Sequence, residues 1–367
     1  MLASTSTVSQ CSHGSGVPDK ASSADAGCGD TGCGMRIPPN RNLRCVLQSI
    51  STFAAPSSSP ASYHGRVTQR WQEILSRGGR VLIDGGTGSE LRRRGMPLDA
   101  ALWSALAPLT HYELLRGIHA DYVAAGADVI TTNTFAATRF VLEAADRANE
   151  LAAIHARAVQ AAREARDTSG REVAIAGSIS CLPPRFDVHA YPDERTERAA
   201  YRELAETLVD AGVDLLVLEM LQETRHAPLA CEAVGDVGVP VWLGVSCRLG
   251  VGDALVGFDF PLVPLEHCLD VLLPFEPAAV SVMHSPVAAV GPALDAIRAR
   301  WPGPLGAYPE LGDGARAPAA SPDALAAHAQ DWLARGARIV GGCCGTTPQH
   351  ILALAALRDA TPATESG

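Results

Sequence analysis

The sequence contains no apolar run that approaches the roughly 20 residues needed for a membrane-spanning helix. It also has no compact apolar segment of the kind that a secretory signal peptide requires. Basic side chains form no cluster, and the 40 Asp and Glu residues outnumber the 30 Lys and Arg residues, which gives a formal net charge of −10. We therefore expect no membrane partner and no nucleic-acid partner.

The ten cysteines form no disulfide framework. A chain of 367 residues with 47% hydrophobic residues buries a sizeable core without disulfide bonds. Because no secretory segment is evident, we expect a reducing, cytoplasmic setting in which the thiols are available for metal binding or catalysis.

Residues 1–64 are rich in Ser, Gly, Ala and Pro and show no helical or strand periodicity. We expect a disordered extension that is dispensable for the fold, or an over-long gene model. Cys28 and Cys33, with His13 nearby, could be read as a metal site, but their surroundings cannot form a core to hold it. The predicted division is an extension at 1–64, one domain at 65–360 and a tail at 361–367.

From Val81 onward, short apolar runs alternate with loops marked by Gly or Pro and with amphipathic helices. This alternation predicts a (β/α)8 barrel of the TIM type. An open doubly wound sheet is the alternative, but its dinucleotide-binding form needs a Gly-x-Gly-x-x-Gly turn that Asp84-Gly-Gly-Thr-Gly-Ser89 does not supply. The expected strands are 81–84, 129–132, 173–176, 215–219, 241–245, 279–283, 304–308 and 338–341.

Several expected helices carry boundary signals. Ser321-Pro322 predicts an N-cap followed by Pro at the first helical position, and Thr110-His-Tyr-Glu113 fits a capping box. Glycine is expected to end three helices within similar phrases: Ala125-Gly-Ala-Asp-Val-Ile130, Ala211-Gly-Val-Asp-Leu-Leu216 and Arg335-Gly-Ala-Arg-Ile-Val340.

The most distinctive motif is Gly341-Gly-Cys-Cys-Gly345, which follows the last expected strand. Adjacent side chains of a regular strand point to opposite faces, but a glycine-rich loop can turn both thiols the same way. Two converging thiolates suit zinc, provided that a third ligand exists. The alternative is a tight turn that carries two small buried residues.

A barrel gathers its chemistry at the C-terminal ends of its strands. The residues with suitable side chains at these positions are Asp84, Glu219, Cys247, His284, Cys343 and Cys344.

Asp84-Gly-Gly-Thr-Gly88 and Gly341-Gly-Cys-Cys-Gly345 together resemble the homocysteine S-methyltransferase family, and the resemblance covers about 81–357. Thr131-Thr-Asn-Thr-Phe135, Asp214-Leu-Leu-Val-Leu-Glu219 and Tyr308-Pro309 are supporting matches. The resemblance implies a zinc-dependent barrel that transfers a methyl group from an onium donor to the thiol of homocysteine, or of a related thiol, to give methionine. It also implies three cysteine ligands, and an amino-acid subsite at Asp84, Gly85, Gly86 and Glu219.

The sequence departs from the family at the third ligand, because Ser281-Val-Met-His-Ser-Pro286 carries His284 where the family has cysteine. Histidine is a good zinc ligand, so we predict a Zn²⁺ site of His284, Cys343 and Cys344. Cys247 is the alternative third ligand, and His284 would then be a hydrogen-bonded histidine at a strand end. Asp84 could instead be a turn or helix-cap residue, and Glu219 a structural residue.

A second departure concerns the methyl donor. The segment Gly177-Ser-Ile-Ser-Cys-Leu-Pro-Pro-Arg-Phe186 lacks the Gly-Pro of the family, and Glu310 stands where asparagine is common. The donor and the acceptor thiol therefore stay open, as does the oligomeric state. Two other functions are kept beside methyl transfer: a barrel enzyme of another class that binds a phosphorylated substrate, and a thiol-binding module without turnover.

Overall fold

The structure is a computed structural model that describes residues 64–181, 187, 189–312 and 320–359. Residues 1–63 of the expected extension and the tail at 361–367 lie outside the described residues, together with Cys11, Cys28, Cys33 and Cys45. The domain boundaries at 64 and 360 therefore remain predictions.

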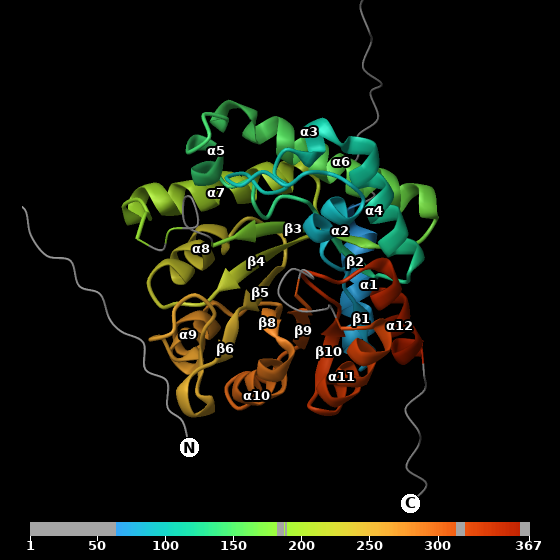
Figure 1. Cartoon of the computed structure of the whole chain (residues 1–367), viewed down its shortest axis with the longest axis vertical. Coiled ribbons are helices and arrows are strands. Elements are labelled where there is room, and N and C mark those ends of the chain that lie inside the picture. Colours follow the sequence, from blue (N-terminus) through green and yellow to red (C-terminus); the bar gives the residue numbers. More distant parts are fainter. Residues whose placement is uncertain (1–63, 182–186, 188, 313–319, 360–367) are drawn as a thin grey trace, which may run out of the picture. The chain divides into compact units, whose positions relative to one another are not determined.

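Eight parallel strands form one sheet in the order β1-β10-β9-β8-β5-β4-β3-β2 (Figure 1). The sheet closes because Ile83 pairs with Val129, and the N–H of Asp84 donates to the carbonyl of Val129 at 3.0 Å. The expected (β/α)8 barrel is confirmed. Its strands are β1 Val81–Leu82, β2 Val129–Thr131, β3 Ala174–Ser180, β4 Leu215–Leu221, β5 Val241–Val245, β8 Ala279–Pro286, β9 Leu305–Glu310 and β10 Ala337–Val340.

Helices surround the strands (Figure 1). They are α1 His64–Ser76, α2 Thr87–Arg93, α3 Ala107–Thr110, α4 Tyr112–Ala124, α5 Arg139–Glu143, α6 Leu151–Ser169, α7 Glu194–Ala211, α8 His226–Val234, α9 Leu265–Leu272, α10 Val287–Arg298, α11 Pro322–Ala334 and α12 Pro348–Asp359. Short 3-10 turns lie at η1 Ala148–Glu150, η3 Val251–Asp253 and η4 Leu273–Phe275. Within the described ranges, no helix combines the length and apolarity that crossing a membrane requires.

No sequence pattern indicated the antiparallel hairpin formed by β6 Cys247–Leu249 and β7 Leu255–Gly257. The hairpin lies between β5 and α9 in the chain, and its turn contains Gly250 and Gly252. Its strands are three residues long each, too short for a recognisable alternation of apolar and polar residues. The segment after β7 returns to the barrel and supplies two residues of the site described below.

Alternation along the strands divides the apolar residues into two layers. Val81, Ile83 and Trp242 belong to the cluster inside the barrel, whereas Leu82 belongs to the layer between strands and helices. Trp71 of α1 joins the inner cluster and packs edge-to-face on Trp242, with ring centroids 4.9 Å apart. Because Val81 and Trp242 lie at the starts of β1 and β5, α1 covers the N-terminal end of the barrel.

The expected glycine stops are confirmed, since Gly126, Gly212 and Gly336 have φ values of +110°, +94° and +95°. Ser321 is also a cap, because its hydroxyl accepts the N–H of Ala324 at 3.2 Å and Pro322 follows at the first helical position.

The predicted capping box at Thr110 and Glu113 is wrong. Thr110 ends α3, and its hydroxyl donates to the carbonyl of Leu106 at 2.9 Å. His111 precedes α4 and makes no capping bond with its side chain. Glu113 pairs with Arg116 instead. Thr110 is the last residue of the short helix α3, so it does not cap the start of α4.

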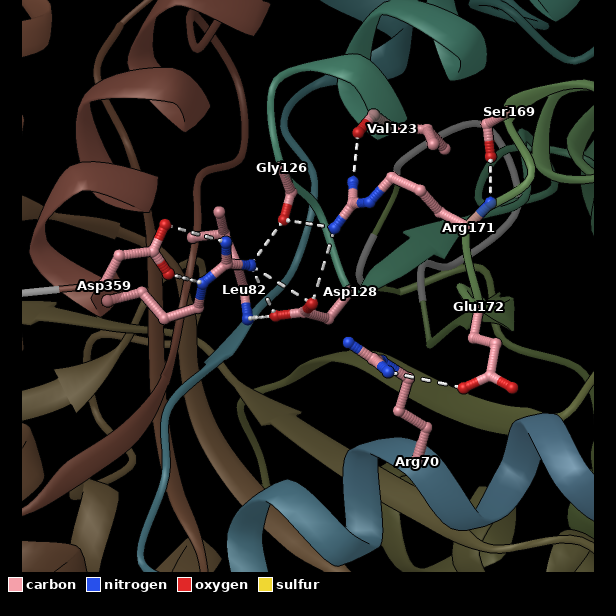
Figure 2. Close-up of polar contacts among 10 residues, drawn as sticks. Arg70, Leu82, Val123, Gly126, Asp128, Ser169, Arg171, Glu172 and Asp359 are labelled. Atoms are coloured by element: carbon pink, nitrogen blue, oxygen red, sulfur yellow. Dashed lines mark hydrogen bonds and ion pairs between the residues drawn. The ribbon is translucent and has the colours of Figure 1, made fainter.

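Two of the three helix-ending phrases contain an aspartate that ties neighbouring strands together. The carboxylate of Asp128 accepts the N–H of Leu82 at 3.0 Å (Figure 2), and the carboxylate of Asp214 accepts the N–H of Ile175 at 2.8 Å. Asp128 also forms ion pairs with Arg358 of α12 at 3.0 Å and with Arg171 at 3.7 Å. These contacts fix the starts of β1 and β2 relative to the last helix.

Candidate active site

Three sulfur and nitrogen donors converge at the C-terminal edge of the barrel. The sulfur atoms of Cys343 and Cys344 are 3.9 Å apart, and Nδ1 of His284 lies 3.5 Å from the sulfur of Cys343. One ligand atom from each of the three residues lies within 4.8 Å of the others. The predicted ligands are thus brought together, although they are far apart in the sequence.

His284 reaches this group because β8 departs from regular pairing near its end. The register between β8 and β9 shifts between Met283 and Pro286, and His284 has a φ of +42°. Regular alternation would place Met283 inside the barrel and His284 outside it. The left-handed backbone turns the imidazole inward as well, which a bulge at a barrel rim can do.

The two cysteines sit in a loop that the backbone holds on both sides. The N–H of Cys343 donates to the carbonyl of Pro309 at 2.9 Å, and the carbonyl of Cys344 accepts the N–H of Leu311 at 2.8 Å. The loop after β1 approaches so closely that a Cβ at Gly86 would lie 2.5 Å from the carbonyl oxygen of Cys343. Glycine at 86 is therefore required for the two loops to meet.

The thiols of Cys343 and Cys344 differ in acidity. The thiol of Cys343 donates a hydrogen bond to Cys344, and the His284 imidazole lies beside it, so the pKa of Cys344 is held well below its ordinary value. The same hydrogen bond, together with burial, raises the pKa of Cys343. One thiolate thus forms readily in this group, and a cation would stabilise a second one.

Cys247, the alternative third ligand, does not join this group. Regular alternation along β5 points Ser246 inward, where its hydroxyl donates to the carbonyl of Met283 at 3.0 Å. Cys247 lies in the outer apolar layer, where the hydroxyl of Ser285 donates to its sulfur at 3.8 Å. Burial raises the pKa of the Cys247 thiol to about 11, as expected for an inert buried thiol.

Asp84 is buried with 2% of its surface exposed, and it follows β1 directly. Its carboxylate accepts the N–H of Thr131 at 2.8 Å and the hydroxyl of the same residue. Burial raises its pKa to about 8, although the hydrogen bonds from Thr131 oppose this shift. The side chain caps no helix, because the residue that precedes α2 is Gly86.

Glu219 is 7% exposed and points into the barrel from β4. Its carboxylate accepts the hydroxyl of Ser178, and the hydroxyl of Tyr308 lies beside it. Burial raises the pKa of Glu219 to about 7, and the same carboxylate contributes to the raised pKa of Asp84. Neither carboxylate forms an ion pair with an Arg or Lys of the described residues, so two acids share an environment that lacks a fixed cation.

These groups line one cavity of about 300 Å³. Gly85 and Gly86 form part of its wall. Among the described residues that line it, three are carboxylic acids and none is Arg or Lys. The wall therefore does not suit the phosphorylated substrate that we considered as an alternative. The aromatic lining residues are Trp103, Phe135, Phe258 and Tyr308.

The sequence did not indicate Trp103, Phe258 or Asp259 as site residues. Trp103 lies in the connection before α3, and the neighbouring Ser104 exchanges hydrogen bonds with the side chain of Asn133 at 3.0 and 2.8 Å. The motif Thr131-Thr-Asn-Thr-Phe135 therefore has a structural role: Thr131 supports Asp84 and Asn133 supports the segment that contains Trp103.

Two positions at which the sequence departs from the family concern the methyl donor. In the first, the loop that follows β3, residues 182–186 lie outside the described residues. The second, Glu310, is the last residue of β9.

A parallel barrel with two thiols, an imidazole and two buried carboxylates at its C-terminal edge defines a class of barrel enzyme that binds a soft metal at this edge. The model of the family "Homocysteine S-methyltransferase" matches residues 81–358. The homocysteine S-methyltransferase of Escherichia coli is 30% identical over 314 residues, which cover 77% of this chain and 96% of that protein. Homocysteine S-methyltransferase 3 of Zea mays is 27% identical over 323 residues, which cover 79% of this chain and 92% of that protein.

Among solved structures, the metallated form of the homocysteine methyltransferase MmuM from Escherichia coli is similar, with a TM-score of 0.66 and 26% identity over 78% of this chain and 99% of that chain. The chain described here belongs to the homocysteine S-methyltransferase family. Its activity is methyl transfer to the thiol of homocysteine. The metallated relative and the His-Cys-Cys donor group support a zinc ion as its cofactor.

Proposed function

We propose that His284, Cys343 and Cys344 hold the zinc ion, that Asp84 and Glu219 bind the ammonium group of homocysteine, and that the aromatic part of the cavity receives a cationic methyl donor. The observation that carries this proposal is the convergence of a complete donor set and two unpaired buried carboxylates on one cavity.

The donor distances fit zinc. Zn–S bonds of about 2.3 Å and Zn–N bonds of about 2.0 Å at tetrahedral angles separate two sulfurs by about 3.8 Å and a sulfur from a nitrogen by about 3.5 Å. The measured separations are 3.9 Å between the cysteine sulfurs and 3.5 Å between the Cys343 sulfur and the His284 nitrogen. Three protein ligands leave one position of a tetrahedral site for substrate, as in catalytic zinc sites.

When bound, the zinc ion lowers the pKa of a substrate thiol, so that the thiol reacts as a thiolate. The protein groups around it position the rest of the amino acid. Asp84 is held by Thr131 and Glu219 by Ser178, so both carboxylates have fixed orientations. An ammonium group placed between them would supply the cation that both lack, and it would offset the cost of burying them.

The aromatic lining supports a cationic donor. Phe258 lies against His284, with ring centroids 4.9 Å apart, and Trp103 and Phe135 line the same cavity. A sulfonium or quaternary ammonium group cannot donate an ordinary hydrogen bond, but it is attracted to the face of an aromatic ring. A methyl group on such a centre would face the homocysteine sulfur, which attacks it as the bond to the donor breaks.

The ammonium assignment can be tested with Asp84→Asn and Glu219→Gln. Each substitution removes a charged hydrogen-bond acceptor from a buried site, so homocysteine should bind roughly 10- to 100-fold more weakly. 4-Mercaptobutanoate, which has the same thiol and carboxylate but no ammonium group, serves as the matched ligand. We expect its affinity to change little, and the zinc content to be retained. Equal losses for both ligands would contradict the assignment.

We also propose a reducing, cytoplasmic location. All six cysteines in the described part of the chain are free thiols, and four of them are buried. The proposed ligands Cys343 and Cys344 are only partly buried, and an oxidising compartment would favour their oxidation over metal binding.

A further inference from the structure

The cavity has a third carboxylate that homocysteine does not explain. Asp259 lies between β7 and α9, and it lines the cavity together with Asp84 and Glu219. Whereas those two residues are buried, Asp259 is exposed. It thus stands where the cavity meets solvent, and its neighbour Phe258 is the residue that packs on His284.

Asp259 is held in place by a residue that follows the neighbouring strand β4. The side-chain amide of Gln222 donates to its carboxylate at 3.0 Å, and the N–H of Asp259 donates to the amide oxygen of Gln222 at 2.7 Å. Gln222 directly follows β4 and is only 2% exposed. This reciprocal pair fixes the carboxylate, which retains further acceptor positions for a ligand.

The charges in the cavity indicate what this carboxylate would bind. Asp84 and Glu219 suffice for the ammonium of homocysteine, and no Arg or Lys among the described lining residues neutralises Asp259. A donor that directs its methyl-bearing cation toward the His284 end of the cavity lies along Phe258 and brings the rest of its body to Asp259. A second cationic group at that point would be attracted, and a carboxylate would be repelled.

We propose that Asp259 is a specificity-determining residue, which selects methyl donors that carry an ammonium group in addition to the methyl-bearing onium centre. The proposal rests on the proposed function, because it takes the aromatic part of the cavity as the donor site. Asp259 takes no part in the methyl transfer itself, so it acts on donor binding.

The test compares two sulfonium donors in the full-length zinc protein. S-Methylmethionine carries an α-ammonium group, whereas dimethylsulfoniopropionate has the same dimethylsulfonium and carboxylate groups without it. Asp259→Asn removes the charge but keeps an oxygen that accepts from Gln222. We expect kcat/KM for S-methylmethionine to fall about two- to fivefold through KM, the range of an exposed ion pair, with kcat unchanged. For dimethylsulfoniopropionate, kcat/KM should not fall.

Asp253→Asn is the matched control, because Asp253 is an exposed acid in the turn of the same hairpin and does not line the cavity. Its φ of +60° suits asparagine, and we expect both donors to be used as before. Equal losses for both donors in Asp259→Asn, or no loss for either, would overturn the proposal. So would a parent protein that uses neither donor, or that prefers dimethylsulfoniopropionate. Zinc content and homocysteine binding, measured on the same samples, report separately whether the proposed metal and homocysteine sites hold.

Discussion

At the scale of single residues, the identity of residue 284 sets the charge of the metal site. Three cysteine thiolates around zinc carry a formal charge of −1, whereas two thiolates and a neutral imidazole are formally neutral with Zn²⁺. A less negative donor set leaves less electron density on a bound thiolate, so the thiolate should bind readily but attack a methyl group more slowly. Phe258 and the left-handed backbone at His284 hold the ring in this role.

His284→Ala should therefore weaken zinc binding severely, because two ligands remain out of three. His284→Cys should keep zinc and raise the rate of methyl transfer, provided that the shorter side chain reaches the metal. Zinc content after dialysis against a chelator measures the first effect, and the exposed His328 on α11, changed to alanine, is the control. An alanine variant that holds zinc as tightly as the parent would show that the third ligand is another residue, and Cys247→Ser would then be tested.

The tandem cysteines give a second prediction at this scale. Cys343→Ser or Cys344→Ser should abolish zinc binding and turnover while the barrel stays folded, because both residues lie in a loop beyond β10 and are only partly buried. Metal analysis measures the bound zinc, and circular dichroism shows whether the barrel is still folded. If both single variants kept one zinc per chain and full activity, these cysteines would not be ligands.

At the scale of elements, the C-terminal helix α12 depends on one buried carboxylate. Arg358 of α12 contacts both Asp128, whose side chain is 4% exposed, and Asp359, whose side chain is 66% exposed (Figure 2). Asp128→Asn should lower the free energy of unfolding by about 2–3 kcal/mol, because it leaves Arg358 and the N–H of Leu82 with a poorer partner. Asp359→Asn removes the exposed contact of the same arginine and should cost less than about 1 kcal/mol. Urea unfolding compares the two, and equal effects would contradict this account.

Several elements could be predicted from the sequence because their signals are local. Val81, Ile339 and Val340 are β-branched residues next to glycine loops, and Gly126, Gly212 and Gly336 end helices by the backbone conformation that they alone adopt easily. The thiol motif could be found for the same reason, since it follows a recognisable strand, whereas His284 was predicted from its place at the third ligand position of the family. Alternation along β5 would also have placed Cys247 outside the barrel.

Other features depend on contacts between distant segments, which no local pattern reports. The pair of Gln222 and Asp259 joins two loops 37 residues apart, and Asn133 and Ser104 are 29 residues apart. The prediction of a capping box at Thr110 is wrong because the chain forms the short helix α3 just before α4. The hydroxyl of Thr110 donates to the carbonyl of Leu106 and does not cap α4. Tertiary contacts decided the first two cases, whereas a competing local helix decided the third.

At the scale of the whole molecule, two buried histidines contribute a loss of stability in acid. His119 of α4 and His155 of α6 are 0% and 1% exposed, and burial lowers the pKa of each to about 4. At these two positions the unfolded chain therefore binds more protons between about pH 6.5 and pH 4, and the contribution of the two histidines to stability falls as the pH drops through this window. The raised pKa values of Asp84 and Glu219 act in the opposite direction, because the folded chain binds the protons of these carboxyl groups more tightly. At pH 5 the loss should be about 2 kcal/mol for each histidine relative to pH 7.5.

Chemical unfolding of metal-free parent and variant proteins at the two pH values isolates the contribution of one histidine without a contribution from metal release. Between pH 7.5 and pH 5 the change in stability of His119→Leu should be more favourable than that of the parent by about 2 kcal/mol, because the variant lacks one of the two buried histidines and keeps the carboxyl groups. Both ring nitrogens of His119 are buried without a partner in the described residues. His328→Leu on the exposed face of α11 is the matched substitution. An unchanged pH dependence in His119→Leu would show that other groups cause the acid sensitivity.

We have proposed that His284, Cys343 and Cys344 bind a zinc ion to which homocysteine adds its sulfur. X-ray absorption at the zinc edge, recorded on the zinc protein before and after addition of homocysteine, identifies the ligands of the metal. We expect two sulfur neighbours near 2.3 Å and an imidazole nitrogen near 2.0 Å in the first spectrum, distances typical of zinc sites. Homocysteine should then add one further sulfur. Three protein sulfurs before addition, no imidazole, or a spectrum unchanged by homocysteine would contradict it.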